Sequence, residues 1–316
     1  MATGFKTARL VTVFGGSGFL GRYVVRRLAA SGARVRVAVR NPEAAAFLTP
    51  LGDVGQIVPV QANIRDDATV ARAIQGADAV INLVGILFER GRQTFRAVHV
   101  EGAERIAVAA RDANISTLLQ ISALAADPKA ASHYAQTKAA GEAAVHAAFP
   151  TAVLLRPGVV FGAEDLFFNR FAALACLTPF LPLIGGGKTR LQPVAARDVA
   201  DAIVCALDGH DGETIELGGP EIYTFRALME AMLQTIERQR VLLPVPFAVA
   251  RLAAFFLEFL PVPLLTRDQV RLLENDNVVR RSAKSFADLG IVPTPLEVAL
   301  PNQLARFRPG GGKHQI

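Results

Sequence analysis

Cysteine is scarce in this 316-residue chain, and its scarcity excludes two classes of protein. The two cysteines, Cys176 and Cys205, lie far apart and belong to no CxxC or Cys/His cluster. A disulfide-stapled fold or a cysteine-ligated metal centre requires such clusters. We therefore expect no metal site and a reducing compartment.

The chain also lacks a secretory leader and a run of about 20 apolar residues, the length that spans a bilayer. Its first residues lead almost directly into an apolar stretch, residues 10–14. The longest apolar segment, residues 246–261, is bounded by prolines and interrupted by Arg251 and Glu258. We expect a protein on the cytoplasmic side of a membrane, without a signal or transit peptide.

Acidic residues are absent from the first 40 positions, which carry eight Lys and Arg, more than the net charge of +6 of the whole chain. Such an excess attracts anionic partners. There is no zinc spacing, no RNA-binding signature and no basic patch interleaved with aromatics, so we expect no nucleic-acid partner. An anionic cofactor, or an acidic protein or membrane surface, fits better.

The stretch VFGGSGFLGR, residues 13–22, predicts a dinucleotide-binding turn. An apolar strand precedes it, and apolar residues recur with helical period from Phe19 onward. We expect Gly15 to allow the tight turn, Gly18 to admit a pyrophosphate and Gly21 to let helix and strand pack closely. The predicted cofactor contacts in this turn are Gly15, Ser17, Gly18, Phe19, Leu20 and Gly21.

Arg40 stands at the end of the next strand, where an acidic residue would bind a ribose 2′-hydroxyl. A guanidinium there matches a 2′-phosphate, so NADPH is predicted over NADH, with Asn41 beside it as a further contact. The alternative interpretation is an ordinary solvated arginine at a strand end.

Alternating strands and helices continue to about residue 155 and predict a Rossmann-type, doubly wound parallel sheet with a smaller C-terminal α/β lobe. The sheet domain is expected over 1–162, with returns from about 191–220, and the lobe over 163–316. The predicted strands are 10–14, 33–42, 57–61, 79–85, 118–121 and 152–155; the predicted helices are 68–75, 94–113 and 134–149. Strand ends add Asn63, Ile64, Leu83, Val84, Gly85 and Ser122 to the predicted cofactor contacts.

Tyr134 and Lys138 lie four residues apart on a predicted helix and therefore share a face. An ammonium beside a phenol lowers the phenol pKa, which would let the tyrosine exchange a proton while the lysine binds the nicotinamide ribose. A chance pairing is the alternative.

The motifs GGSGFLG, NLVGI, YAQTK and LRPGVVFG occur in the order found in extended and atypical short-chain dehydrogenase/reductases, over roughly the first 220 residues. This resemblance implies a Rossmann domain, places Tyr134 and Lys138 at the nicotinamide ribose, and places Pro157 to Val160 by the carboxamide. Active members have a catalytic Ser or Thr just beyond the position of Ser122; this chain has Ala123 and Leu124. His99 replaces their usual asparagine and is expected to be a packed helix residue rather than a proton donor.

Further motifs, among them LPLIGGGKTRLQPV, ELGGPEIYTFRALME and LLTRDQVRLLENDNVV, resemble the short-chain-dehydrogenase-like accessory subunits of respiratory complex I over nearly the full length. That resemblance implies a tightly held NADPH with a structural or assembly role, partner subunits near the membrane arm junction, and a peripheral position on the bacterial inner membrane. Two alternatives stay open: an NAD(P)-dependent oxidoreductase or epimerase/dehydratase acting on a nucleotide sugar or small carbonyl, and a redox-sensing NADPH-binding module.

The segment 246–261 predicts a helix that is apolar around almost its whole circumference. One interpretation is a helix buried in the smaller lobe; the other is an interfacial helix that contacts a partner subunit or the membrane surface. Nearby, the glycine run at 185–188 lacks the spacing of a P-loop and predicts a hairpin.

Overall fold

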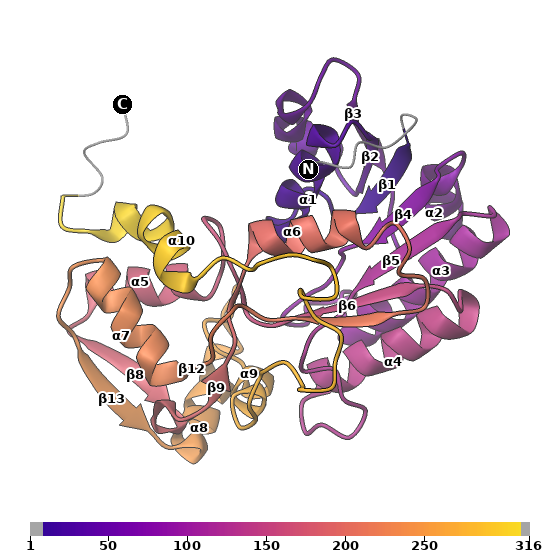
Figure 1. Ribbon diagram of the computed structural model, residues 1–316. Helices are drawn as coiled ribbons and strands as arrows, with labels where there is room; N and C mark the ends of the chain where they lie inside the picture. Colours follow the sequence, from indigo (N-terminus) through magenta and orange to yellow (C-terminus); the bar gives the residue numbers. More distant parts are fainter. Residues whose placement is uncertain (1–8, 311–316) are drawn as a thin grey trace.

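Seven parallel strands form the main sheet of the protein, whose computed structural model describes residues 9–310 (Figure 1). Their spatial order is β11-β6-β5-β4-β1-β2-β3, and every neighbouring pair is parallel. The strands are β1 (Leu10–Phe14), β2 (Arg34–Val39), β3 (Ile57–Gln61), β4 (Ala79–Asn82), β5 (Thr117–Ile121), β6 (Val153–Pro157) and β11 (Thr214–Leu217). The predicted Rossmann-type sheet is confirmed, and its order reverses between β1 and β4, where such sheets bind ligands.

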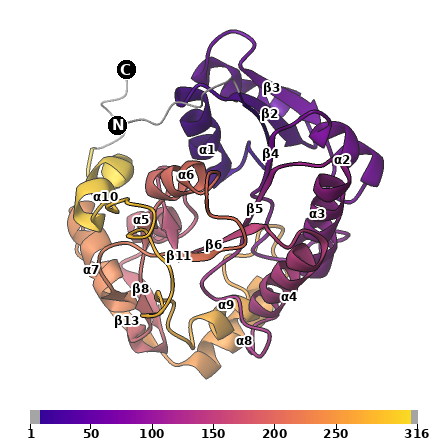
Figure 2. The same ribbon diagram turned by 45° about the vertical axis from the view of Figure 1, so that its right-hand side comes forward.

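Helices cover both faces of this sheet (Figure 2). α1 (Phe19–Ala30) and α6 (Ala196–Cys205) lie on one face; α2 (Asp67–Ile74), α3 (Gly102–Asp112) and α4 (His133–Ala148) lie on the other. Val11 and Val13 pack into the core on the side of α1, whereas Phe14 packs into the core beneath α2 to α4. Both faces of β1 are thus buried, which explains its continuous apolar sequence.

The predicted helix 94–113 is divided into a π-helix, η2 (Arg96–Glu101), and α3. The backbone of η2 presses against α4 at Gly141, where a Cβ atom would lie 2.0 Å from the carbonyl oxygen of His99. Only a residue without a side chain fits there, so Gly141 allows the close contact that brings η2 against the helix of Tyr134.

The chain after residue 160 contributes to two cores. α6 and β11 return to the main sheet, and Phe286 and Leu289 pack into the same core. A second core contains Phe168, Phe225 and other buried residues of the C-terminal half. Around it lie α5 (Phe168–Leu177), β8 (Phe180–Ile184), α7 (Phe225–Thr235), β13 (Val241–Val245), α8 (Phe247–Leu257), α9 (Arg267–Leu272) and α10 (Leu296–Leu304).

Four short strands lie outside the main sheet: β7 (Val160–Phe161), β9 (Arg190–Leu191), β10 (Val194–Ala195) and β12 (Tyr223–Thr224). The 3-10 helices are η1 (Glu43–Leu51), η3 (Gly185–Gly187) and η4 (Ala305–Phe307). The predicted hairpin at the glycine run is wrong. β8 pairs in parallel with β13, while β9 pairs with β12. The glycines only form the turn η3 that separates β8 from β9.

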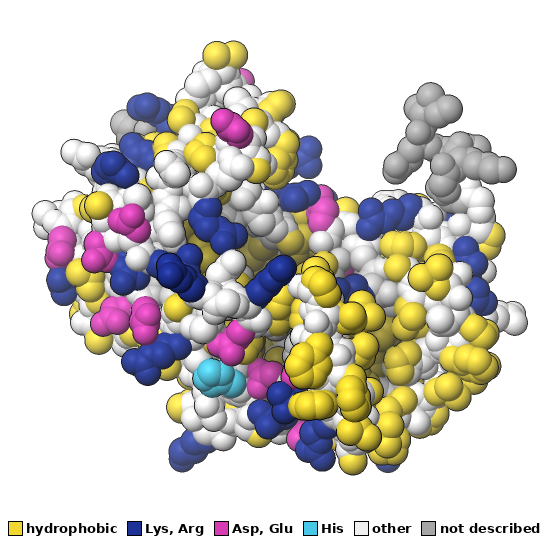
Figure 3. Space-filling view, turned by 180° about the vertical axis from the view of Figure 1, so that it is seen from behind, with side chains coloured by type: hydrophobic (Ala, Val, Ile, Leu, Met, Phe, Trp, Pro, Cys, Tyr) yellow, Lys and Arg dark blue, Asp and Glu magenta, His cyan; other side chains and the backbone are white. Residues whose placement is uncertain are grey.

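The apolar helix α8 is exposed, so the interpretation of a helix buried in the lobe is wrong. Only Ala250 and Ala254 of α8 are buried, whereas Phe256 is 64% and Phe259 77% exposed. We call the exposed hydrophobic residues of α8 and the following loop the apolar face: Val249, Leu252, Phe255, Phe256, Phe259, Leu260, Val262 and Leu264. Hydrophobic side chains gather over this lobe in Figure 3. Across residues 9–310, no helix combines the length and apolar character needed to cross a membrane.

Candidate functional site

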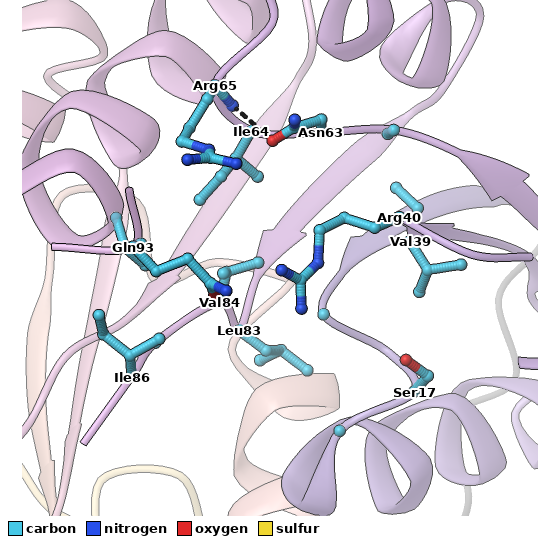
Figure 4. Close-up of a pocket in the computed structure, with 16 residues that line it drawn as sticks. Ser17, Val39, Arg40, Asn63, Ile64, Arg65, Leu83, Val84, Ile86 and Gln93 are labelled. Atoms are coloured by element: carbon cyan, nitrogen blue, oxygen red, sulfur yellow. Dashed lines mark hydrogen bonds between the residues drawn. The ribbon is translucent and has the colours of Figure 1, made fainter. Parts of the chain in front are cut away.

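A cavity of about 260 Å³ opens where the sheet order reverses, at the carboxyl ends of β1 to β4 (Figure 4). Nine of the predicted cofactor contacts line it: Gly15, Ser17, Gly18, Arg40, Asn63, Ile64, Leu83, Val84 and Gly85. Ala38, Val39, Ala62, Arg65, Ile86, Gln93 and Val98 complete the lining. The cavity therefore gathers residues from four strand ends, as the sequence predicted.

The amino end of α1 faces this cavity without a competing side chain. Gly18 is its N-cap, no side chain caps it, and no acidic residue occupies the first turn. Gly15 adopts φ +79°, and a Cβ on Gly21 would lie 2.3 Å from the carbonyl oxygen of Gly15. The unpaired N–H groups and the positive helix end suit a phosphate.

The other predicted residues of this turn and strand end lie outside the cavity lining. Phe19 and Gly21 belong to the first turn of α1, and Leu20 packs against the main core. Asn41 accepts hydrogen bonds from the N–H groups of Glu43 and Ala44, at 3.1 and 3.3 Å, and so stabilises the start of η1.

The cavity lining contains two arginines and no carboxylate. Arg40 extends into the cavity from the end of β2 (Figure 4) and makes no hydrogen bond or ion pair within residues 9–310. Arg65, which the sequence reasoning missed, faces it across the cavity; its guanidinium donates to the carbonyl of Arg92 at 3.0 Å and its N–H donates to Asn63 Oδ1 at 3.1 Å. This pair of guanidinium groups favours a ligand with an anionic group at the β2 end.

A buried amide pair shapes the end of β4. Asn82 donates through Nδ2 to Gln120 Oε1 at 2.8 Å and accepts the N–H of Val84 through Oδ1 at 3.0 Å. These bonds fix the turn from Leu83 to Gly85. At Gly85, a Cβ atom would lie 3.9 Å from Lys138 Nζ, so this residue joins the cavity to the predicted nicotinamide end.

Tyr134 and Lys138 lie at the predicted nicotinamide end, but the pKa of Tyr134 is shifted in the direction opposite to the expectation. Burial raises the pKa of Tyr134 to about 12, so the expected lowering is wrong in this structure. Burial lowers the pKa of Lys138 to about 8, and its ammonium donates to the carbonyl of Ile121 at 3.0 Å. The sequence showed that the two residues share a helix face; it could not show that both are desolvated.

His99 is buried, as expected, and lies between the cavity and the predicted nicotinamide end. Its Nε2 accepts the N–H of Ile86 at 3.1 Å, so Nδ1 carries the proton and faces Thr137 Oγ1 at 3.2 Å. Burial and the nearby Lys138 lower the pKa of His99 to about 3, so it is neutral at physiological pH. Its ring stacks on Phe95 and meets the edge of Tyr134.

The position of the family's hydroxyl is apolar here. Ser122 is buried and its Oγ has no hydrogen-bond partner. Leu124 donates its N–H to the carbonyl of Pro157 at 3.0 Å, and its side chain lies against Gly158. Val160 pairs with Val194 across β7 and β10. Within the described part of the chain, no cluster of three or more His, Cys, Asp and Glu residues is placed to hold a metal ion.

Residues 11–218 match the model of the NAD dependent epimerase/dehydratase family. The chain belongs to this family. The match spans the whole main sheet, from β1 to β11, and the cavity lies where this family's NAD(P)-binding fold has its strand-order reversal.

Several proteins are similar to this chain over nearly its full length. The chain is 37% identical to "NADH dehydrogenase (ubiquinone) 1 alpha subcomplex subunit 9, mitochondrial" of Arabidopsis thaliana, over 96% of this chain and 79% of that protein. It is 32% identical to the "NADH-ubiquinone oxidoreductase 40 kDa subunit, mitochondrial" of Neurospora crassa, over 94% of this chain and 79% of that protein. An NADPH-dependent quinone oxidoreductase of Escherichia coli, solved with NADPH, superposes with a TM-score of 0.74 at 21% identity, covering 92% of this chain and 99% of that one.

Replacing His99 by glutamine is expected to make the stability of the protein less sensitive to acid. A histidine with a folded pKa of about 3 and an ordinary pKa of 6.5 costs nothing above pH 6.5 and destabilises the fold increasingly as the pH falls. At pH 5 the cost is about 2 kcal/mol, since each pKa unit is worth about 1.4 kcal/mol. Urea unfolding at pH 7 and pH 5 should therefore show about 2 kcal/mol less acid-induced loss in His99→Gln than in the wild type.

His146, on the same side of the sheet in α4, provides the control. His146→Gln removes an imidazole from the same side of the sheet and shows what the substitution itself does to stability. If His99→Gln and the wild type lose the same stability over this interval, the buried neutral state of His99 is refuted.

Proposed function

We propose that this protein is an NADPH-binding, non-catalytic accessory subunit of a proton-pumping NADH:quinone oxidoreductase. The observation that carries the proposal is the near full-length similarity to two proteins named as subunits of that enzyme, at 37% and 32% identity. Similarity to the oxidoreductases and epimerases of the same fold would by itself support only cofactor binding.

The preference for NADPH rests on the charge of the cavity. Arg40 projects into it without a protein partner among the described residues, Arg65 lies opposite, and no carboxylate is present to accept a ribose 2′-hydroxyl. A 2′-phosphate would receive charge-assisted hydrogen bonds from Arg40. The pyrophosphate would meet the N–H groups at the start of α1.

Two residues at the nicotinamide end of the site support a role without turnover. Leu124 occupies the region in which active relatives carry a hydroxyl, and its side chain cannot donate a hydrogen bond to a substrate carbonyl. Tyr134, with a pKa of about 12, is a poor proton donor near neutral pH, because proton-transfer catalysis works best when the pKa lies close to the working pH. In this role Tyr134 and Lys138 fasten the nicotinamide ribose.

The apolar face supports docking on the oxidoreductase. An exposed cluster containing three phenylalanines is costly in water and typical of interaction sites. We propose that it contacts subunits near the membrane arm junction, with residues 246–261 at the membrane surface. The protein would then be peripheral, on the cytoplasmic side of a bacterial inner membrane.

The test is to recover the chain from native membranes in mild detergent, together with whatever it binds. We expect it to migrate with NADH:quinone oxidoreductase activity on native gels and to release about one NADPH per chain, identified by mass. The bound NADPH should resist oxidation by added carbonyl compounds. Recovery apart from the complex would contradict the proposal, and substrate-dependent oxidation of the nucleotide, lost in Tyr134→Phe, would instead favour a reductase or epimerase/dehydratase.

A further inference from the structure

The carboxylate of Asp268, in the C-terminal half of the chain, caps the first turn of α4. Asp268 Oδ1 accepts the N–H of His133 at 2.7 Å, and Oδ2 accepts the N–H of Tyr134 at 3.0 Å. Oδ2 also accepts the hydroxyl of Ser132, the N-cap of α4, at 2.8 Å. The start of the helix that carries Tyr134 and Lys138 is therefore held by a residue 134 positions later in the chain.

Asp268 is itself fixed by α9. Thr266 and Gln269 form a capping box at the start of this helix, with reciprocal hydrogen bonds of 3.1 Å. Asp268 stands in the first turn of α9, so the amino ends of α9 and α4 converge on the same carboxylate. Both positive helix ends are stabilised by its charge.

The first turn of α4 is coupled to the walls of the cofactor site. The single Thr137 hydroxyl proton is shared between the carbonyls of His133 and Tyr134, which lie 2.9 and 3.0 Å from Oγ1, and Oγ1 accepts from His99 Nδ1. His99 in turn accepts the N–H of Ile86, which lines the cavity. A shift of this turn would therefore move Tyr134 and loosen the wall at Ile86.

On its other side, α9 is attached to the helix that bears the apolar face. Glu258, the C-cap of α8, accepts the backbone N–H of Arg267 at 2.6 Å and its guanidinium Nε at 2.9 Å. The same guanidinium lies over the ring of Phe255, 5.2 Å from its centre. Continuous contacts thus lead from α8 through Arg267 and Asp268 to Tyr134.

We propose that Asp268 is a positioning residue that sets the nicotinamide end of the site and makes its geometry depend on α8 and α9. The proposal rests on the proposed function, because NADPH is taken as the ligand. It predicts that loss of Asp268 affects the nicotinamide half of the ligand and spares the adenosine half, since Arg40, Asn63 and Ile64 line the cavity from the ends of β2 and β3, which Asp268 does not contact.

The experiment compares two ligands in full-length Asp268→Ala. NADPH affinity should fall about five- to thirtyfold, the upper part of the range for loss of a helix N-terminal cap. The affinity for 2′,5′-ADP, which fills only the adenosine half, should stay within about twofold. Hydrogen exchange at residues 133–135 should accelerate by a similar factor, and Asp268→Asn, which keeps a neutral acceptor, should recover part of each loss.

Glu230→Ala is the matched control, since Glu230 pairs with Arg226 within α7 of the same lobe and should leave both affinities unchanged. Glu258→Ala tests the attachment to α8 and should also accelerate exchange at 133–135; unchanged exchange would overturn the dependence on α8. Equal weakening of both ligands in Asp268→Ala would indicate general damage and overturn the positioning role, as would unchanged NADPH affinity. If the wild type bound neither ligand, the proposed function itself would fall.

Discussion

Replacing Arg40 by alanine is expected to weaken NADPH binding about 10- to 150-fold while changing NADH binding by less than about threefold. The two nucleotides differ only in the 2′-phosphate, and hydrogen bonds to charged groups are worth about 1.5–3 kcal/mol, which converts to this range. Arg40 is free to supply such bonds, because it makes no hydrogen bond or ion pair within residues 9–310. Titration of nicotinamide fluorescence with each nucleotide measures both affinities.

Arg34 is the matched control, since it lies exposed at the opposite end of β2 and does not line the cavity. Arg34→Ala should leave both affinities unchanged. Arg65→Ala should weaken NADPH by a smaller factor, because its guanidinium is already bonded to the carbonyl of Arg92. Parallel weakening of NADPH and NADH in Arg40→Ala would mean that Arg40 does not read the 2′-phosphate.

The main sheet could be predicted from the sequence because its signals are local. β1 and β3 have the predicted bounds, since an apolar run flanked by turn residues specifies a buried strand without knowledge of its neighbours. The pairing of β8 with β13 could not be predicted in this way, because about 60 residues separate the two strands. The exposure of α8 could not be predicted either. An apolar sequence shows that a helix could bury its side chains, but it does not show whether another element covers them.

The candidate cavity was largely predictable for a related reason: strand ends of a parallel sheet gather at one edge, so Gly15, Asn63 and Gly85 could be predicted to lie together. Arg65 was missed because its direction is set by the loop after β3. Asp268 was missed because its contact with α4 joins distant parts of the chain. The pKa of Tyr134 was predicted with the wrong sign because desolvation depends on packing that the spacing to Lys138 does not reveal.

Replacing Lys138 by methionine is expected to stabilise the ligand-free protein by about 2 kcal/mol at pH 7 and to abolish tight NADPH binding. The lowered pKa of about 8, against an ordinary 10.5, means that burial of the charged ammonium costs on the order of 3 kcal/mol. Losing its hydrogen bond to the carbonyl of Ile121 offsets about 1 kcal/mol of the gain. Methionine fills a similar volume without a charge.

The pH dependence of this gain has a defined sign. Below pH 8 the wild type carries the full cost; between pH 8 and 10.5 the folded state loses the proton first, so the cost and the advantage of Lys138→Met both shrink. Urea unfolding at pH 7, 8 and 9 measures this, with Lys129→Met, at an exposed lysine, as the control. A variant less stable than the wild type at pH 7 would show that Lys138 serves the fold.

Added NADPH should reverse the order of stability. At 100 times its dissociation constant, NADPH stabilises the wild type by about 2.7 kcal/mol, whereas Lys138→Met, lacking the ribose contact, should gain little. Lys138→Met would then be the more stable protein without ligand, and the wild type would be the more stable one when saturated with NADPH. An ammonium that destabilises the empty fold and is compensated only by the ligand is the signature of a binding residue, and it requires neither turnover nor a substrate.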